Sequence, residues 1–121
     1  AAMGDAVLER WFSDAFRGTD ALEAWRNMLI RTPAEGYAGC CYALRDADMN
    51  AQTKTLSLPI LCIGGTEDGA SPPAVVRATA DIIPGARYVE ISGAGHLPCV
   101  EKPDEFADLI TAFLKETGHV Q

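Results

Sequence analysis

The sequence of 121 residues contains no apolar run that approaches the roughly 18 residues needed to cross a membrane. Residues 1–10 also lack a basic stretch followed by an apolar core, so secretion is not indicated. Basic residues are few, ten against seventeen acidic ones, and the formal net charge of -7 would repel a phosphate backbone. We therefore expect a cytoplasmic protein that binds neither membranes nor nucleic acids.

Metal-binding patterns are missing as well. The four cysteines, at positions 40, 41, 62 and 99, form no Cys-x-x-Cys pair, and only two histidines are present. We expect no zinc site and reduced thiols, with Cys62 acting as a small apolar residue of the core. Repeats and low-complexity linkers are absent too. A hydrophobic fraction of 48% with 22% charged residues is typical of one soluble globular domain.

The first fifty residues have the apolar spacing of amphipathic helices. One helical stripe is formed by Leu8, Trp11, Phe12 and Phe16. A second stripe is formed by Leu22, Trp25 and Leu29. A further helix is predicted to begin at Thr32-Pro33-Ala34-Glu35, because this run has the form of a capping box in which Thr32 accepts from a helical amide. We expect the first stripe to be core rather than substrate pocket.

Near Thr55 the pattern changes to strands that alternate with helices. Residues 59–63 form a short, wholly apolar run of the kind found in parallel strands, and Gly64 and Gly65 are expected to end it. Ser71 is predicted to cap the next helix, whose inward face is Val75, Val76, Thr79, Ile82 and Ile83. Residues 87–91 form a second strand. Pro103 begins a last helix with an inward face of Phe106, Leu109, Ile110, Phe113 and Leu114.

This order of strand, helix, strand and helix predicts an α/β fold with two parallel strands. Two strands cannot shield both faces of a sheet, so the sheet is expected to be incomplete. Either a partner segment would supply further strands, or the chain would self-associate to cover its strand edge. We divide the chain into a helical segment, residues 1–50, and a β-α-β-α segment, residues 51–121.

The loops that follow the two strands carry the chemistry, because ligands of open α/β sheets bind at the carboxyl ends of the strands. Asp68 lies in the first loop and His96 in the second. A carboxylate in this position can accept the Nδ1 proton of the imidazole, while Nε2 deprotonates a nucleophile. Glu67 is the rival carboxylate. His119 lies in the C-terminal tail and is expected to be incidental.

The run from Pro59 to Asp68, followed by Ala94-Gly95-His96, resembles the last two catalytic loops of the α/β-hydrolases. Together with residues 37–46 and 83–89, it is most similar to the 3-oxoadipate enol-lactonases of aromatic catabolism. The resemblance implies the C-terminal portion of an α/β-hydrolase, with the last two parallel strands and flanking helices preceded by helices of a cap. Asp68 and His96 match the acid and base of the family's Ser-Asp-His triad.

What the resemblance further implies is a hydrolase that opens a lactone or ester through a seryl acyl-enzyme, with no cofactor. The first fifty residues would then be the remnant of a helical cap over the active site. Aromatic and cationic cap residues are candidates to hold a carboxylate-bearing substrate, and we single out Trp25 and Arg31 on that ground.

The nucleophile of the family is not found, because no Gly-x-Ser-x-Gly motif occurs in the sequence. Ser13, Ser57 and Ser92 lack the flanking glycines, and Ser71 is followed by Pro72, which has no N–H to donate to an oxyanion. Cys41, in Gly-Cys-Cys-Tyr-Ala, follows a predicted helix start rather than a strand. We expect the chain to be inactive alone and to need a Ser-bearing N-terminal hydrolase half.

Three functions stay open at this point. The first is one part of an enol-lactone hydrolase. The second is another α/β-hydrolase chemistry, such as ester, epoxide or carbon-carbon bond hydrolysis, because the same two loops serve all of these reactions. The third is a non-catalytic fragment that associates with itself.

Overall fold

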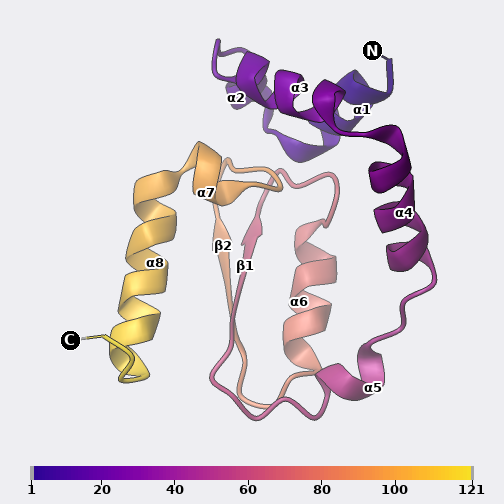
Figure 1. Cartoon of the computed structure of the whole chain (residues 1–121). Coiled ribbons are helices and arrows are strands. Elements are labelled where there is room, and N and C mark those ends of the chain that lie inside the picture. Colours follow the sequence, from indigo (N-terminus) through magenta and orange to yellow (C-terminus); the bar gives the residue numbers. More distant parts are fainter. Residues whose placement is uncertain (1, 121) are drawn as a thin grey trace.

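The computed structural model describes residues 2–120, and its centre is a sheet of two parallel strands (Figure 1). Strand β1 spans Leu61–Gly65 and strand β2 spans Arg87–Ile91. They pair in register, so that Gly65 at the end of β1 lies opposite Ile91 at the end of β2. The predicted parallel pairing is confirmed. Because both strands end at the same level, the loops that follow them begin side by side.

Helices cover both faces of the sheet. Helix α6, Pro73–Asp81, connects the strands and packs against both of them, while α8, Pro103–Glu116, lies on the opposite face (Figure 1). The side chains of α8 that approach β1 are those expected from its periodicity, namely Phe106, Ile110 and Phe113. The guanidinium of Arg87 lies over the Phe113 ring and pairs with Glu116, which joins β2 to the end of α8.

The N-terminal helices lie across the carboxyl ends of the strands (Figure 1). They are α1, Ala2–Trp11; α2, Asp14–Arg17; and α3, Leu22–Arg31. Leu8 and Phe12 are almost completely buried there, and the Phe12 ring stacks on Phe16 at 4.7 Å between centroids and contacts Trp25 at 5.8 Å. Apolar burial of these side chains is the main contribution holding this layer together.

The next two helices are α4, Ala34–Arg45, and α5, Asn50–Thr53. The predicted start of α4 is confirmed, but its predicted cap is wrong. Thr32 donates its hydroxyl to the Met28 carbonyl at 3.0 Å, so it satisfies the end of α3, and Pro33 occupies the N-cap position without a side-chain bond. A threonine that follows a helix directly has an unpaired carbonyl within reach, and here that acceptor is taken instead of the amide of the following helix.

Two further expectations in the second segment are corrected. Gly64 and Gly65 do not stop the strand at Ile63 but are its last two residues, because both pair with β2. Ser71 does not cap α6: Pro72 is the N-cap residue, and the Ser71 amide donates instead to the carboxylate of Asp68. The inward face of α6 is centred on Ala80, with Ile83 just beyond the helix, whereas Val75 is exposed.

Within residues 2–120 the sheet has only these two strands, so each strand has a single hydrogen-bonded neighbour. The predicted incomplete sheet is therefore confirmed. The division at residue 50 stays a prediction. Across the described residues, no helix combines the length and the apolarity needed to cross a bilayer.

Candidate active site

The loops after β1 and β2 are joined to one another by backbone hydrogen bonds. The Thr66 amide donates to the Ile91 carbonyl at 3.1 Å, and the Glu67 amide donates to the Ala94 carbonyl at 2.9 Å. The Thr66 hydroxyl accepts in turn from the Gly93 amide at 2.9 Å. These bonds continue the strand pairing past the end of the sheet, and they fix the relative positions of the two loops.

Glycine at position 65 makes this close contact possible. A Cβ atom built on Gly65 would lie 2.1 Å from the Gly95 carbonyl oxygen and 2.3 Å from that of Ala94. These are backbone atoms that cannot rotate away, so any other residue would push the two loops apart. Gly65 thus permits the second loop to pass directly over the end of β1.

Asp68 and His96 meet in this arrangement. One carboxylate oxygen of Asp68, Oδ1, accepts from the amides of Ala70 at 2.7 Å and Ser71 at 2.8 Å. The other oxygen, Oδ2, lies 2.9 Å from Nδ1 of His96. The side chain of Asp68 is 5% exposed and that of His96 is 34% exposed. The acid is therefore enclosed and fully hydrogen-bonded, while part of the imidazole faces outward.

This geometry selects one tautomer of the neutral imidazole. Because an ionised carboxylate can only accept hydrogen bonds, the proton shared with Asp68 sits on Nδ1 of His96, and Nε2 is left with its lone pair. A base held in one tautomer by a buried carboxylate can remove a proton from a hydroxyl placed next to Nε2, and the carboxylate stabilises the imidazolium that forms.

The rival carboxylate lies elsewhere. Glu67 is exposed, and its side chain points toward Gly93, where one of its oxygens would lie 3.9 Å from a Cβ atom built on that glycine. It is Asp68, not Glu67, that the structure hydrogen-bonds to the imidazole.

A third segment, residues 10–13 at the end of α1, contacts both loops. The Arg10 carbonyl accepts from the Gly69 amide at 3.0 Å, and the Trp11 carbonyl accepts from the His96 amide at 2.7 Å. The Ser13 amide donates at 3.2 Å to Glu101, at the end of α7, Pro98–Glu101, the short helix after His96. Both loops are thus anchored to the N-terminal helical layer as well as to each other.

Comparison with known proteins agrees with this arrangement. Residues 1–109 match the sequence profile of the Alpha/beta hydrolase family, which is most of the chain. This chain belongs to the α/β-hydrolase family. The predicted fold class, the C-terminal portion of such a hydrolase with two parallel strands and flanking helices, is confirmed.

Two relatives of this α/β-hydrolase chain are enol-lactonases. It is 32% identical over 108 residues to 3-oxoadipate enol-lactonase 2 of Acinetobacter baylyi, a match that covers 88% of this chain and 40% of that protein. The crystal structure of the enol-lactonase from Burkholderia xenovorans LB400 is 39% identical, with a TM-score of 0.88 over 94% of this chain and 44% of that one.

An esterase is equally similar in shape. The structure of a thermophilic esterase from Thermogutta terrifontis is 29% identical, with a TM-score of 0.88, over 99% of this chain and 45% of that one. The chain therefore spans about 40% of the length of the Acinetobacter baylyi enol-lactonase and 44 to 45% of these two solved chains.

Trp25 and Arg31, the predicted substrate-binding residues of this hydrolase chain, are not brought together with Asp68 and His96. Trp25 packs on Phe12 in the helical layer, and Arg31 is exposed at the last position of α3. Their role stays a prediction.

The aromatic residue beside the imidazole is Trp11. Its ring lies 6.2 Å from the His96 ring between centroids, with a tilt of 30°. The sequence placed Trp11 in the core stripe with Phe12, and the apolar spacing holds no signal that separates the two. Only Phe12 is fully enclosed, whereas Trp11 is half-buried at the end of α1.

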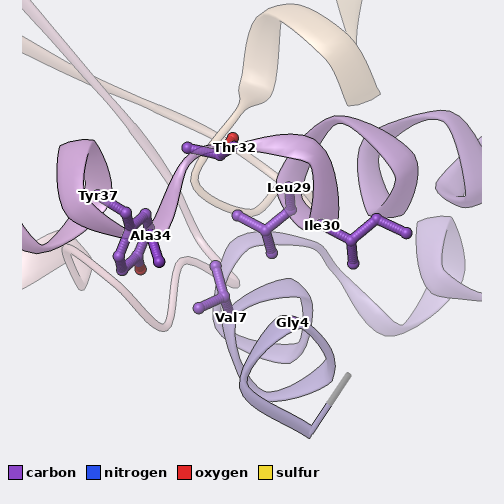
Figure 2. Close-up of a pocket in the computed structure, with 7 residues that line it drawn as sticks. All are labelled: Gly4, Val7, Leu29, Ile30, Thr32, Ala34 and Tyr37. Carbon is purple, nitrogen blue, oxygen red and sulfur yellow. The ribbon is translucent and has the colours of Figure 1, made fainter.

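An apolar pocket of about 210 Å³ lies between α1, α3 and α4 (Figure 2). Its lining residues are Gly4, Val7, Leu29, Ile30, Thr32, Ala34 and Tyr37. Figure 2 shows the side chains of Val7 and Leu29 facing the same space between the helices. Neither loop contributes to this pocket, nor does Trp25 or Arg31, so it is separate from the acid-base pair.

Four of the serine and cysteine residues considered as nucleophiles lie in a buried contact, on a helix surface or in exposed connecting segments. Ser13 is 2% exposed, and its hydroxyl is already engaged with the Phe16 amide and the Glu101 carboxylate. Cys41 is exposed on α4, away from any strand end. Ser57 and Ser92 are exposed in connecting segments.

The cysteines are free thiols in this structure, and three of them are exposed. Cys62 in β1 is half-buried, and burial raises the pKa of its thiol above the ordinary value. Among residues 2–120, no three histidine, cysteine or acidic side chains gather as the ligands of a metal ion.

Proposed function

We propose that this chain supplies the acid and the base of a Ser-Asp-His hydrolase that acts on a lactone or an ester. The observation that carries the proposal is the 2.9 Å hydrogen bond between Asp68 and Nδ1 of His96 at the carboxyl ends of two parallel strands. A buried carboxylate with two further amide donors is a fixed orienting group, and the exposed part of the imidazole is accessible to a reacting hydroxyl.

The nucleophile in this proposal is a serine of a segment outside these 121 residues, either continuous with the chain or separate. Nε2 of His96 accepts the proton of the serine hydroxyl as its oxygen bonds to the substrate carbonyl carbon. The ring or alkyl C–O bond then breaks, and the leaving oxygen takes that proton. Water attacks the acyl-serine next, with His96 again accepting and returning a proton, and the free acid leaves.

The substrate that we favour is 3-oxoadipate enol-lactone, which would be opened to 3-oxoadipate. The enol-lactonases of Acinetobacter baylyi and Burkholderia xenovorans support this choice through identities of 32% and 39%. A simple ester is the second candidate, since the Thermogutta terrifontis esterase reaches the same TM-score of 0.88. Both reactions use the same acid and base, so they differ only in what holds the substrate.

Complementation tests the proposal. The chain is co-expressed with the part of the Burkholderia xenovorans enol-lactonase that precedes its matched region, and the hydrolysis of enol-lactone and of an aryl ester is followed. We expect turnover only when both polypeptides are present. The ratio of kcat/KM for the two substrates then decides between lactone and ester.

Matched variants complete the experiment. His96→Ala should abolish turnover in the assembly, whereas Glu67→Gln should leave it unchanged. Equal turnover with His96→Ala would contradict the acid-base assignment. Stable association of the two polypeptides without turnover on either substrate would favour a non-catalytic chain.

A further inference from the structure

One carboxylate beside the acid-base pair has no part in the proposed chemistry. Glu101, the last residue of α7, accepts the Gly95 amide on Oε1 at 2.7 Å and the Ser13 amide on Oε2 at 3.2 Å. The Ser13 hydroxyl donates a short hydrogen bond to the same Oε2. A single side chain therefore binds three donors that come from two segments more than eighty residues apart in the sequence.

Ser13 is itself buried in this contact, beside a pocket that Ser13 and Glu101 both line. Ser13 is 2% exposed, and its hydroxyl also accepts from the Phe16 amide at 3.2 Å as the N-cap of α2. Every hydrogen-bonding group of Ser13 thus has a protein partner. Removing the Glu101 carboxylate would leave the Ser13 amide and the proton of the Ser13 hydroxyl without their protein acceptor, at a cost in stability.

The bond from the Gly95 amide to Glu101 lies next to the imidazole in the chain. Gly95 immediately precedes His96, whose own amide donates to the Trp11 carbonyl at 2.7 Å. The space around Gly95 is filled on both sides: a Cβ atom there would lie 2.4 Å from the Trp11 carbonyl oxygen and 2.8 Å from Oε1 of Glu101. The backbone before His96 is therefore held between α1 and the Glu101 carboxylate.

We propose that Glu101 is a positioning residue of the acid-base pair. It fixes the 95–96 peptide against residues 11–13, and through that peptide it sets the direction in which the His96 ring meets Asp68. The proposal rests on the function proposed above, because it assigns Glu101 to the reaction of His96. The hydrogen bonds of Glu101 go to Ser13 and Gly95, so Glu101 acts on the imidazole through the backbone.

Glu101→Gln tests this role in the complemented enzyme. The amide replaces one acceptor by a donor, so either the Gly95 bond or the two Ser13 bonds are lost while size and shape are kept. We expect kcat to fall by about 10- to 100-fold with KM within about twofold, because a small displacement of a general base slows the chemical step without weakening substrate binding. Glu105→Gln, the same change at an exposed position of α8, should leave kcat as in the wild type.

Ser13→Ala is a milder second variant, because it removes only the hydroxyl contact. Suppose that Ser13 acts on His96 through Glu101. The fold-loss of kcat in the double variant is then smaller than the product of the fold-losses of Ser13→Ala and Glu101→Gln. Independent losses that multiply in full would contradict a shared route through Glu101.

A spectroscopic measurement on the 121-residue chain needs no turnover. Nitrogen-15 shifts of the histidine rings, recorded at mildly alkaline pH where imidazole is neutral, report which ring nitrogen carries the proton. The wild type should show His96 protonated on Nδ1, and Glu101→Gln should move a measurable fraction of the ring to the Nε2 tautomer. His119, which is exposed in the tail, is the internal reference.

The two readouts separate the two proposals. Unchanged kcat and an unchanged His96 tautomer in folded Glu101→Gln would overturn the positioning role, even if His96→Ala proved inactive. Full turnover of His96→Ala would overturn the proposed function, and the tautomer of His96 in Glu101→Gln would still decide whether Glu101 orients the ring.

Discussion

Two regions of the molecule invert the usual relation between polarity and burial. At the carboxyl ends of the strands the Asp68 carboxylate and the Ser13 hydroxyl are buried, and each has a full set of partners. Along residues 34–58, by contrast, large apolar side chains are exposed. They are Tyr42 at 61%, Leu44 at 76%, Met49 at 60% and Leu58 at 70%.

The two regions therefore differ in what they contribute to the geometry of the acid-base pair and to the stability of the chain. The loops after β1 and β2 are over-determined, because backbone bonds to each other, to residues 10–13 and to Glu101 all fix the same geometry. Residues 34–58 bury little apolar surface, and they therefore contribute little to the hydrophobic stabilisation of the chain. The position of the acid-base pair is encoded within these 121 residues, independently of what α4 and α5 contact.

The largest effect is expected at His96. In the complemented enzyme, His96→Ala removes the proposed general base and should lower kcat by about 10⁴-fold or more, because the nucleophile then has no proton acceptor. Circular dichroism should match the wild type, because the backbone bonds between the loops remain, whereas the loss of the hydrogen bond to the buried Asp68 carboxylate should lower the unfolding temperature. A loss of less than about tenfold would show that another group accepts the proton.

Asp68→Asn should come next. The amide oxygen can still accept from Ala70 and Ser71, so the loop is kept, but the amide nitrogen would face Nδ1 and favour the wrong tautomer. We expect a fall in kcat of about 10³- to 10⁴-fold. Glu67→Gln is the matched neighbour, and a larger loss there than at Asp68 would reverse the assignment of the acid.

Replacing one glycine by alanine in each region compares how the two regions affect the free energy of unfolding. Gly95→Ala should destabilise the chain by about 2–3 kcal/mol, because the new Cβ meets the Trp11 carbonyl oxygen at 2.4 Å. Gly39→Ala in α4 meets nothing within 4 Å and should stabilise the chain by about 0.5–1 kcal/mol through helix propensity. Urea unfolding measures both, and equal effects would contradict the difference between the regions.

The smallest effect concerns thiol reactivity. Cys40 and Cys41 are exposed on α4, whereas burial raises the pKa of Cys62 in β1, so less thiolate is present there near neutral pH. Labelling with iodoacetamide should be slowest at Cys62, and its rate should rise only at higher pH than for the exposed thiols. Peptide mapping follows each site, and uniform labelling of all sites would show that β1 is open to solvent.

The raised pKa of Cys62 also determines how the free energy of unfolding changes with pH. Because the folded chain holds the Cys62 proton more tightly than the unfolded one, its contribution to stability is present below the ordinary pKa of a thiol. That contribution is lost as pH rises through the raised value.

Sequence reasoning reached those parts of the fold that depend on local pattern. The alternation of strands with helices predicted β2, and the apolar spacing of a helix predicted α8. The position just after a strand placed Asp68 and His96 at one edge of the sheet. Their hydrogen bond follows from parallel pairing in register, which the strand-helix-strand order implies.

What the sequence missed depends on contacts between distant segments. Nothing in the spacing of Ser13 or Glu101 indicates that they meet, because a carboxylate just before the helix that begins at Pro103 is equally typical of a favourable helix charge. Two local alternatives are missed as well: the rules for helix caps select Ser71 and Thr32, yet the Ser71 amide donates to Asp68, three residues earlier, and the Thr32 hydroxyl donates to the Met28 carbonyl, four residues earlier. Gly65 looked like the end of a strand, but its missing side chain is what admits the Gly95 carbonyl.

The most direct test of the central claim is intact mass spectrometry of the complemented enzyme after brief reaction with an aryl ester. The account predicts an acyl adduct on the polypeptide that carries the serine, which forms quickly with the wild-type chain and hardly at all with His96→Ala. An adduct on the 121-residue chain itself, or equal acylation with His96→Ala, would contradict the claim that this chain supplies the acid and base but not the nucleophile.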